Sequence, residues 1–260
     1  MPLMTQNRLL KFEQVLNMRD FGGYDGRFGH VNSGLLFRSA HLNNATPADL
    51  GRLREIDIRL IVDLRYLSER ERQPNKWPAG HTARTLAFDA SRTGQAPHEA
   101  FIQNDLRVAE DARQYMLSNY AARPGNASFQ DIFRDTLTHM SGSGDAVLVH
   151  CAAGKDRTGT LVALIQSLLG MSDADIMDDY MLTMTAVDVD SFLSPAALMM
   201  EERFGRSYAP EALRPMFGVE PGYLKAALDN MGNAEDYARQ TLGINEAQIA
   251  AIRNRYTVQA

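Results

Sequence analysis

The sequence predicts an α/β fold in which a central, mostly parallel β-sheet is flanked by helices and followed by a helical C-terminal layer. Between residues 34 and 169, short apolar runs of strand length alternate with segments of helical periodicity, as in βαβ units. After residue 170 the pattern is helical throughout. The length of 260 residues suits one large domain, and we expect a single domain over residues 1–260.

The first part of the chain predicts two strands separated by a well-capped helix. Residues 34–38 have a strand pattern. Thr46 and Asp49 have the spacing of a capping box, and Pro47 suits the first helical turn. Residues 58–63 then form an apolar run, so strand, helix and strand follow in the order of a parallel sheet.

The middle of the chain is the least patterned region. Residues 85–88 are strand-like, residues 99–120 have weak helical spacing, and residues 128–140 predict a further helix. We expect a helical insertion near residues 95–125. It is either a lid over a site or a plain surface insertion, and both readings stay open.

The last part begins with a strand and continues in helices. Residues 145–149 predict a buried strand, and residues 160–169 predict the helix that follows it. Ser172, Asn233 and Asn245 predict the starts of later helices, because short polar side chains cap helix N-termini.

Composition and charge limit the possible functions. Hydrophobic residues make up 45% of the chain, and the net charge of −5 argues against general nucleic-acid binding. One cysteine excludes an internal disulfide and a multi-cysteine zinc site. No run of about 20 apolar residues predicts a membrane span, and no signal-peptide pattern is visible. We expect a cytoplasmic protein of undetermined oligomeric state, with secretion after loss of a signal left open.

The only cysteine lies in the segment HCAAGKDRTG, residues 150–159, where a strand turns into a helix. Backbone amides in such a bend, at the positive end of a helix, bind a tetrahedral oxyanion. The Arg157 guanidinium matches two phosphate oxygens, and Gly154 permits a tight bend. The same field favours the Cys151 thiolate, a nucleophile aimed at phosphorus. The predicted phosphate-binding residues are Ala152, Ala153, Gly154, Lys155, Asp156, Arg157 and Thr158.

Two other readings explain this segment less well. A buried structural thiol would not require an arginine at the helix start or the flanking glycines. A nucleotide-binding loop would need serine or threonine after Lys155, where the chain has Asp156. We expect His150 to hydrogen-bond the loop backbone rather than act as a base, and Thr158 to donate to the sulfur.

Cysteine, five residues, arginine, threonine and glycine form the signature loop of cysteine-dependent phosphatases. The full segment resembles that of the bacterial tyrosine phosphatase-like and lipid phosphatase-like enzymes. The resemblance implies a cysteine-phosphatase fold and a reaction that needs no metal or cofactor. Further segments similar to this family are NMRDFGG at 17–23, LFRS at 36–39, IVDLR at 61–65 with Glu69 following, YMLT at 180–183 and LGIN at 242–245.

The resemblance also implies a two-step hydrolysis of a phosphate monoester. Cys151 attacks phosphorus while a general acid protonates the leaving oxygen, and water then hydrolyses the thiophosphate. Arg157 and the loop amides stabilise the transition state. The implied substrates are phosphotyrosine, phosphoserine or phosphothreonine in proteins, and phosphoinositides. In relatives, a lysine at the position of Lys155 accompanies phosphoinositide activity.

Three carboxylates are candidates for the general acid. Asp63 is narrowly favoured because it ends a predicted parallel strand, although a salt bridge with Arg65 or Arg19 is an equal alternative. Asp156, inside the loop, is second, and its alternative is a helix N-terminal charge that orients the neighbouring arginine. Asp89 follows a strand-like segment and is otherwise a plain turn residue.

Supporting roles and competing functions complete the prediction. We expect Arg19 and Asp20 to brace the sheet edge near the loop, together with His150. A retired phosphatase that only binds phosphorylated ligands is disfavoured, because the cysteine and the arginine of the signature are both present. A sulfurtransferase is disfavoured because it would not need Arg157 at the helix start.

Overall fold

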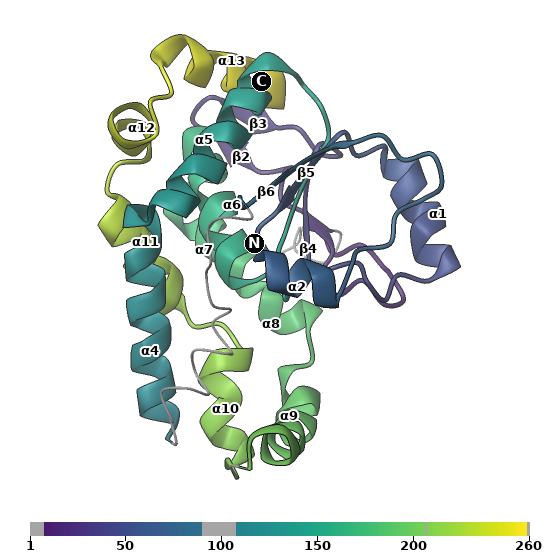
Figure 1. Cartoon of the computed structure of the whole chain (residues 1–260). Coiled ribbons are helices and arrows are strands. Elements are labelled where there is room, and N and C mark those ends of the chain that lie inside the picture. The colour runs from purple at the N-terminus through teal and green to yellow at the C-terminus, as the bar shows by residue number, and fades with distance from the viewer. Residues whose placement is uncertain (1–7, 90–107, 206, 259–260) are drawn as a thin grey trace.

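The computed structural model describes residues 8–89, 108–205 and 207–258. Its centre is a five-stranded sheet that is parallel except for one edge strand (Figure 1). This confirms the predicted fold class. In spatial order the strands are β1 (Arg19–Asp20), β4 (Leu36–Ser39), β7 (Val147–His150), β5 (Leu60–Asp63) and β6 (Arg84–Ala87), with β1 antiparallel to β4.

The strand register aligns the carboxyl ends of the parallel strands. Ser39 pairs with His150, His150 with Asp63, and Asp63 with Ala87. Open α/β sheets build their sites at this edge. The predicted nucleophile, Cys151, is the next residue after β7, so it enters the structure at the centre of that edge.

Side chains alternate between the two faces of the sheet, as strand geometry requires. In β7, Val147 and Val149 pack in the larger core, whereas Leu148 packs in a smaller core with Leu53 of α1. Helix α1 therefore covers one face, and helices from the second half of the chain cover the other (Figure 1). The helices of the first 125 residues are α1 (Pro47–Ile56), α2 (Leu67–Arg72), α4 (Ala109–Ala122) and η2 (Arg123–Gly125).

The helical C-terminal layer is present as predicted, and the structure also contains a second small sheet. This three-stranded sheet is formed by β2 (Asp25–Gly26), β3 (Gly29–Val31) and β8 (Thr257–Val258). The remaining helices are α5 (Ala127–Gly142), α6 (Asp156–Leu168), α7 (Asp173–Met181), α8 (Thr183–Ala186), α9 (Val189–Phe204), α10 (Pro210–Phe217), α11 (Pro221–Met231), α12 (Ala234–Asp236), η3 (Tyr237–Thr241) and α13 (Glu246–Tyr256).

The predicted helix starts are confirmed. Thr46 accepts a hydrogen bond from the Asp49 amide, and the Asp49 carboxylate accepts one from the Thr46 amide, which closes the capping box of α1. Ser172, Asn233 and Asn245 cap α7, α12 and α13 with their side-chain oxygens. Local polar spacing therefore determines where these helices begin.

The predicted insertion near residues 95–125 lies partly outside the described residues, which resume at residue 108. Its described part, α4, runs alongside α11 and close to α10 (Figure 1) and buries Ala112, Met116 and Tyr120 in the larger core. This helix is thus an integral part of the packed domain. A lid at this place stays a prediction.

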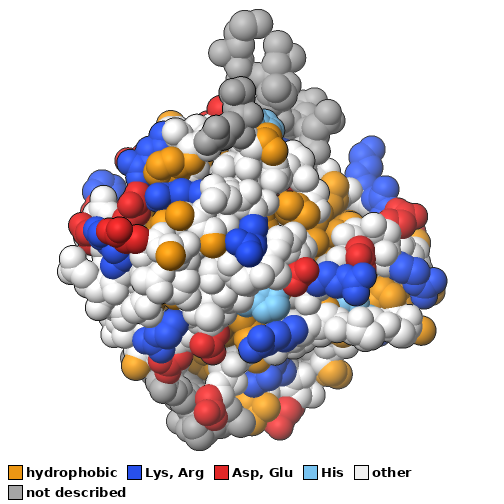
Figure 2. Space-filling model, turned by 90° about the horizontal axis from the view of Figure 1, so that it is seen from above, with side chains coloured by type: hydrophobic (Ala, Val, Ile, Leu, Met, Phe, Trp, Pro, Cys, Tyr) orange, Lys and Arg blue, Asp and Glu red, His pale blue; other side chains and the backbone are white. Residues whose placement is uncertain are grey.

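The charged side chains are mixed over the surface. On the face seen in Figure 2, basic and acidic side chains are interspersed. Within the described ranges, no helix has both the length and the apolar character needed to cross a membrane.

Candidate active site

The loop that follows β7 holds the only cysteine of the chain. Cys151 is buried, and the loop continues to Lys155 before α6 begins at Asp156. Gly154 has a φ of +66°, and a Cβ at this position would collide with the carbonyl of Ser39. Only glycine therefore lets the loop rest directly on the end of β4.

Arg157 is held in one orientation by a buried carboxylate. Its Nη1 and Nη2 atoms donate to the two oxygens of Glu69 at 2.6 and 2.8 Å, and Nη1 also donates to the Leu64 carbonyl. Burial alone would lower the pKa of Arg157, but Glu69 and, to a smaller extent, the charge of Cys151 outweigh it and raise that pKa. The guanidinium is therefore a buried cation that Glu69 holds in place.

Two side chains behind the loop bind its carbonyl groups. Asn17 Nδ2 donates to the carbonyls of Ala153 and Gly154 at 3.1 and 2.9 Å. Arg38 Nη2 donates to the carbonyl of Gly154 at 3.0 Å. These bonds fix the carbonyls of Ala153 and Gly154 and with them the backbone conformation of the loop.

A fully buried carboxylate organises these donors. Asp179 Oδ2 is 2.7 Å from Arg38 Nη1, and Asp179 Oδ1 is 3.1 Å from Arg19 Nε. Burial would raise the pKa of Asp179, but the two arginines outweigh it and lower that pKa. Burial and the like charge of Arg38 lower the pKa of Arg19 to about 10. Asn17, Arg19, Arg38 and Asp179 form what we call the anchoring cluster.

Asp20 braces a neighbouring turn. Its two carboxylate oxygens accept hydrogen bonds from the amides of Gly22 and Gly34 at 2.8 and 2.6 Å. Burial raises the pKa of Asp20. Of the two predicted braces, Arg19 thus reaches Asp179, whereas Asp20 fixes the segment between β1 and β4.

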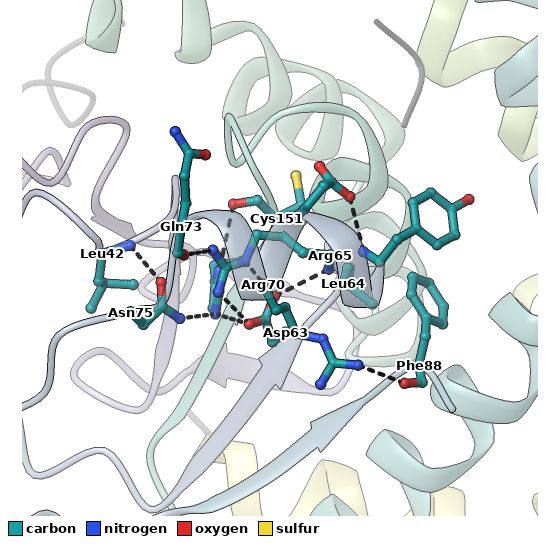
Figure 3. A network of polar contacts seen from close by, with 12 residues as sticks. Leu42, Asp63, Leu64, Arg65, Arg70, Gln73, Asn75, Phe88 and Cys151 are labelled. Atoms are coloured by element: carbon teal, nitrogen blue, oxygen red, sulfur yellow. Dashed lines mark hydrogen bonds and ion pairs between the residues drawn. The ribbon is translucent and has the colours of Figure 1, made fainter. Parts of the chain in front are cut away.

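Asp63 is paired with arginine through both of its oxygens. Oδ1 accepts from Arg65 Nε at 2.9 Å, and Oδ2 accepts from Arg65 Nη2 at 2.7 Å (Figure 3). Burial would raise the pKa of Asp63, but His150 and Arg65 outweigh it and lower that pKa. The structure therefore shows the salt bridge with Arg65, which was the alternative to a general-acid role for Asp63.

His150 is buried and oriented by an asparagine. The Leu42 amide donates to Asn75 Oδ1 at 2.8 Å, so Asn75 presents Nδ2 to His150 Nε2 at 3.1 Å. The imidazole then accepts at Nε2 and carries its proton on Nδ1, 3.5 Å from the carbonyl of Cys151. Burial, aided by the charges of Arg65 and Arg157, lowers the pKa of His150 although Asp63 opposes this shift.

Asp156, the first residue of α6, contacts helix α4. Its Oδ1 accepts a hydrogen bond from the Tyr120 hydroxyl at 2.7 Å and is 3.5 Å from Lys155 Nζ. Arg123 Nη1 donates to the Asp156 backbone carbonyl at 2.8 Å. Within the described part of the chain, Asp156 Oδ2 has no hydrogen-bond partner. We call Tyr120, Arg123, Lys155 and Asp156 the front cluster.

Lys155 is held by the end of a helix. Its Nζ donates to the carbonyls of Met216 and Gly218, at the C-terminus of α10, and the residue is 6% exposed. An ammonium group is stabilised at this negative end of the helix dipole. In this conformation the lysine joins α10 to the loop.

A model of the tyrosine phosphatase family matches residues 10–258, almost the whole chain. The chain belongs to this family. Together with the buried cysteine loop, the match confirms the predicted resemblance and identifies the protein as a phosphatase.

Similar proteins agree with this assignment. The chain is 29% identical over 247 residues to a Cupriavidus necator protein named as a tyrosine-protein phosphatase, with 92% of this chain and 86% of the relative covered. It is 29% identical over 254 residues to the triple specificity protein phosphatase PtpB of Mycobacterium tuberculosis, with 86% and 91% covered. A tyrosine-protein phosphatase of Nostoc commune is 27% identical over 238 residues, with 84% and 72% covered.

Two further predicted site residues of this phosphatase occupy different environments. The Thr158 hydroxyl is buried and has no hydrogen-bond partner among the described residues, so it is available for another acceptor. Asp89 is exposed, two residues beyond the end of β6.

Two cavities differ in their relation to the loop. One of about 100 Å³ adjoins Arg157 and is lined by the aromatic rings of Tyr66 and Phe129 together with Asn119 and Arg123. A larger one, of about 730 Å³, is lined mainly by residues of α7, α11 and α12 and by no residue of the loop. Of these two cavities, the smaller one is in contact with Arg157.

Several residues of this phosphatase site were not assigned a role from the sequence. Glu69 was visible within a family-like segment, but its pairing with Arg157 was not. Asp179 is a carboxylate on the buried face of α7, next to the buried residues Ile176 and Tyr180. A charged residue on such an apolar stripe is a usable signal for a buried ion pair. Asn75 carries no comparable signal.

Proposed function

We propose that this phosphatase is cysteine-dependent and hydrolyses phosphotyrosine through a covalent thiophosphate. The observation that carries the proposal is the place of Arg157 in the first turn of α6, six residues after the buried Cys151 that follows β7, with its guanidinium fixed by Glu69. A nucleophile beneath a fixed phosphate-binding cation is the arrangement that attack on phosphorus requires.

In the first step the Cys151 thiolate forms the S–P bond and the P–O bond to the tyrosine breaks. Asp156 gives its proton to the leaving phenolate oxygen. Arg157 and the loop amides bind the equatorial oxygens, where charge is stabilised in the transition state. In the second step water attacks phosphorus, Asp156 takes a proton from the water, and the S–P bond breaks to release phosphate and thiolate.

We assign the general acid to Asp156 rather than Asp63 because of their partners. A general acid must bring a protonated oxygen to the leaving group. Both oxygens of Asp63 are bound by Arg65, and that pKa is lowered. Asp156 has only Oδ1 engaged by the described residues. It is the first residue of α6 and directly precedes Arg157, the proposed phosphate-binding residue.

Two features favour phosphotyrosine over other monoesters. The cavity beside Arg157 is lined by Tyr66 and Phe129, which suit an aryl group. Lys155 Nζ, which would bind a second phosphate of an inositol headgroup, is engaged by the end of α10. The name of the Mycobacterium tuberculosis relative includes triple specificity, so phosphoserine, phosphothreonine and phosphoinositide substrates belong in the comparison.

The experiment is a comparison of wild type with Cys151→Ser on a phosphotyrosine peptide, in the presence of EDTA. We expect kcat/KM to fall at least about 1,000-fold in the variant and the wild type to need no metal. Acid quench during turnover should trap phosphate on Cys151 of the wild type alone. Equal hydrolysis by both proteins would refute the nucleophile, and absence of turnover by the wild type would indicate a binding module. Cyanide-dependent turnover of thiosulfate would instead indicate a sulfurtransferase.

A substrate panel then tests the specificity. Phosphotyrosine, phosphoserine and phosphothreonine peptides and soluble phosphoinositides are assayed at equal concentration. We expect the phosphotyrosine peptide to have the highest kcat/KM. A higher value for a phosphoinositide would mean that Lys155 leaves Met216 and Gly218 to bind the headgroup.

A further inference from the structure

We propose that Tyr120 is a positioning residue that determines which oxygen of Asp156 carries the catalytic proton. The inference rests on the proposed role of Asp156 as general acid. Tyr120 lies on α4, 36 residues before Asp156 in the chain, and its hydroxyl is 2.7 Å from Asp156 Oδ1. Tyr120 is fully buried, so its side chain is shielded from bulk water.

The direction of the hydrogen bonds follows from the groups involved. An ionised carboxylate can only accept, so Tyr120 gives its single proton to Asp156 Oδ1. The Tyr180 hydroxyl, 2.8 Å from that of Tyr120, must then be the donor of their shared bond. Burial, followed by the charge of Asp156, raises the pKa of Tyr120 well above its usual value, so its proton stays on the hydroxyl.

The ring of Tyr120 is fixed by packing that does not depend on its hydroxyl. It packs edge-on against Tyr180 at 6.3 Å and tilted against Tyr223 at 5.7 Å between ring centroids. The Arg123 guanidinium lies 4.3 Å from the ring centroid, and the same arginine binds the Asp156 carbonyl. A phenylalanine at this position would keep these ring contacts and lose only the two hydrogen bonds of the hydroxyl, to Asp156 and to Tyr180.

The two oxygens of Asp156 are therefore inequivalent. Oδ1 accepts from Tyr120 and is also 3.5 Å from the Lys155 ammonium, so a proton on Oδ1 would face two donors. Oδ2 has no partner among the described residues and is the oxygen free to carry a proton. Tyr120 thus keeps the proton on Oδ2 and limits rotation of the carboxyl group.

The test uses aryl phosphates whose leaving groups differ in basicity. A general acid matters most when the leaving oxygen is basic, as in phenyl phosphate, and least for 4-nitrophenyl phosphate. We expect Tyr120→Phe to lower kcat about 10-fold on phenyl phosphate and less than about 2-fold on 4-nitrophenyl phosphate, with KM unchanged. Tyr180→Phe, which removes only the hydrogen bond between the two tyrosine hydroxyls, should show the same trend to a smaller extent.

Asp156→Asn and the double variant serve as references. Asp156→Asn should show the strongest dependence on the leaving group, and adding Tyr120→Phe to it should change nothing further, because Tyr120 acts only through Asp156. Equal losses on all leaving groups in Tyr120→Phe would overturn this inference and leave the proposed function intact. If Asp156→Asn shows no dependence on the leaving group, the general-acid assignment fails, and the role of Tyr120 fails with it.

Discussion

The carboxylates that are paired with arginine and the carboxylate of Asp156 are bound in different ways. Asp63, Glu69 and Asp179 are buried, and each has both oxygens paired with arginine. Asp156 has one oxygen engaged by Tyr120 and the other without a described partner. The arginine-paired carboxylates fix the positions of backbone and cations, whereas Asp156 keeps one oxygen that no described residue occupies.

This difference distinguishes a carboxylate with a structural role from Asp156, the proposed general acid. An arginine pair that occupies both oxygens removes the positions where a catalytic proton would reside and favours the charged form. A single neutral donor, as Tyr120 is for Asp156, orients the carboxylate and leaves its second oxygen without that hydrogen bond. The number of paired oxygens is therefore more informative than the position of Asp63 at the carboxyl end of β5.

The largest expected effect concerns Asp179, one of the carboxylates paired with arginine. Asp179→Ala would leave Arg19 and Arg38 buried without their counter-charge, and we expect a loss of about 3–5 kcal/mol in the free energy of unfolding. Denaturant titration measures this loss. The adjacent residue Asp178 is exposed, and Asp178→Ala should change stability by less than about 0.5 kcal/mol. Similar values for the two variants would contradict the anchoring role.

The next effect compares the two general-acid candidates directly. Asp156→Asn should slow hydrolysis of a phosphotyrosine peptide about 100-fold, or about 2.7 kcal/mol in activation free energy. Asp63→Asn should lower the activity equally for good and poor leaving groups, because its role is to hold Arg65. Measurement of kcat on phenyl and 4-nitrophenyl phosphate distinguishes them. A leaving-group dependence in Asp63→Asn alone would reverse the assignment.

A smaller effect appears in the pH dependence of stability. His150 has a folded-state pKa below its usual 6.5, so below pH 6.5 the unfolded chain binds more protons and the free energy of unfolding decreases as pH falls. The slope contributed by one such group is at most about 1.4 kcal/mol per pH unit. For Asp63, whose pKa lies below 3.8, the stability contribution is lost only at more acidic pH.

Denaturant titrations between pH 5 and 7.5 check this prediction. His150→Gln should reduce the slope in that range, and Asp63→Asn should alter the dependence below about pH 4. A residual slope is expected from His41, because burial and the charge of Arg65 also lower its pKa. An unchanged slope in His150→Gln would mean that the imidazole is not held neutral.

The smallest effect concerns the front cluster. Lys155→Met removes the hydrogen bonds to Met216 and Gly218, so we expect local opening of α10 to be favoured by about 1 kcal/mol. Hydrogen exchange of the amides in residues 210–218 should then be about fivefold faster. Unchanged exchange in this segment would show that the lysine does not hold the helix.

Much of the fold was predictable because its determinants are local. The capping groups of α1, α7, α12 and α13 lie within a few residues of the helices that they start. The alternation of strands and helices and the cysteine loop are likewise continuous in the sequence. Helix α2 and the pairing of β8 with β3 were not predicted, because weak local patterns do not reveal which distant segments pack on them.

The site was predictable only in its loop. Arg19 and Asp179 lie 160 residues apart, and Arg157 and Glu69 lie 88 residues apart. Such pairs are created by the topology, and no spacing in the sequence encodes them. The same reason explains why Asp63 was favoured as the general acid: its place at the end of a strand was visible, but the occupation of both its oxygens by Arg65 was not.

The close approach of Gly154 to Ser39 links catalysis to the architecture of the sheet. Because the loop rests on the end of β4 with no room for a methyl group, any sliding of β4 against β7 would displace the loop that holds Cys151. This loop therefore cannot reach its final conformation before those two strands are joined. During refolding, recovery of turnover should coincide with completion of the central sheet.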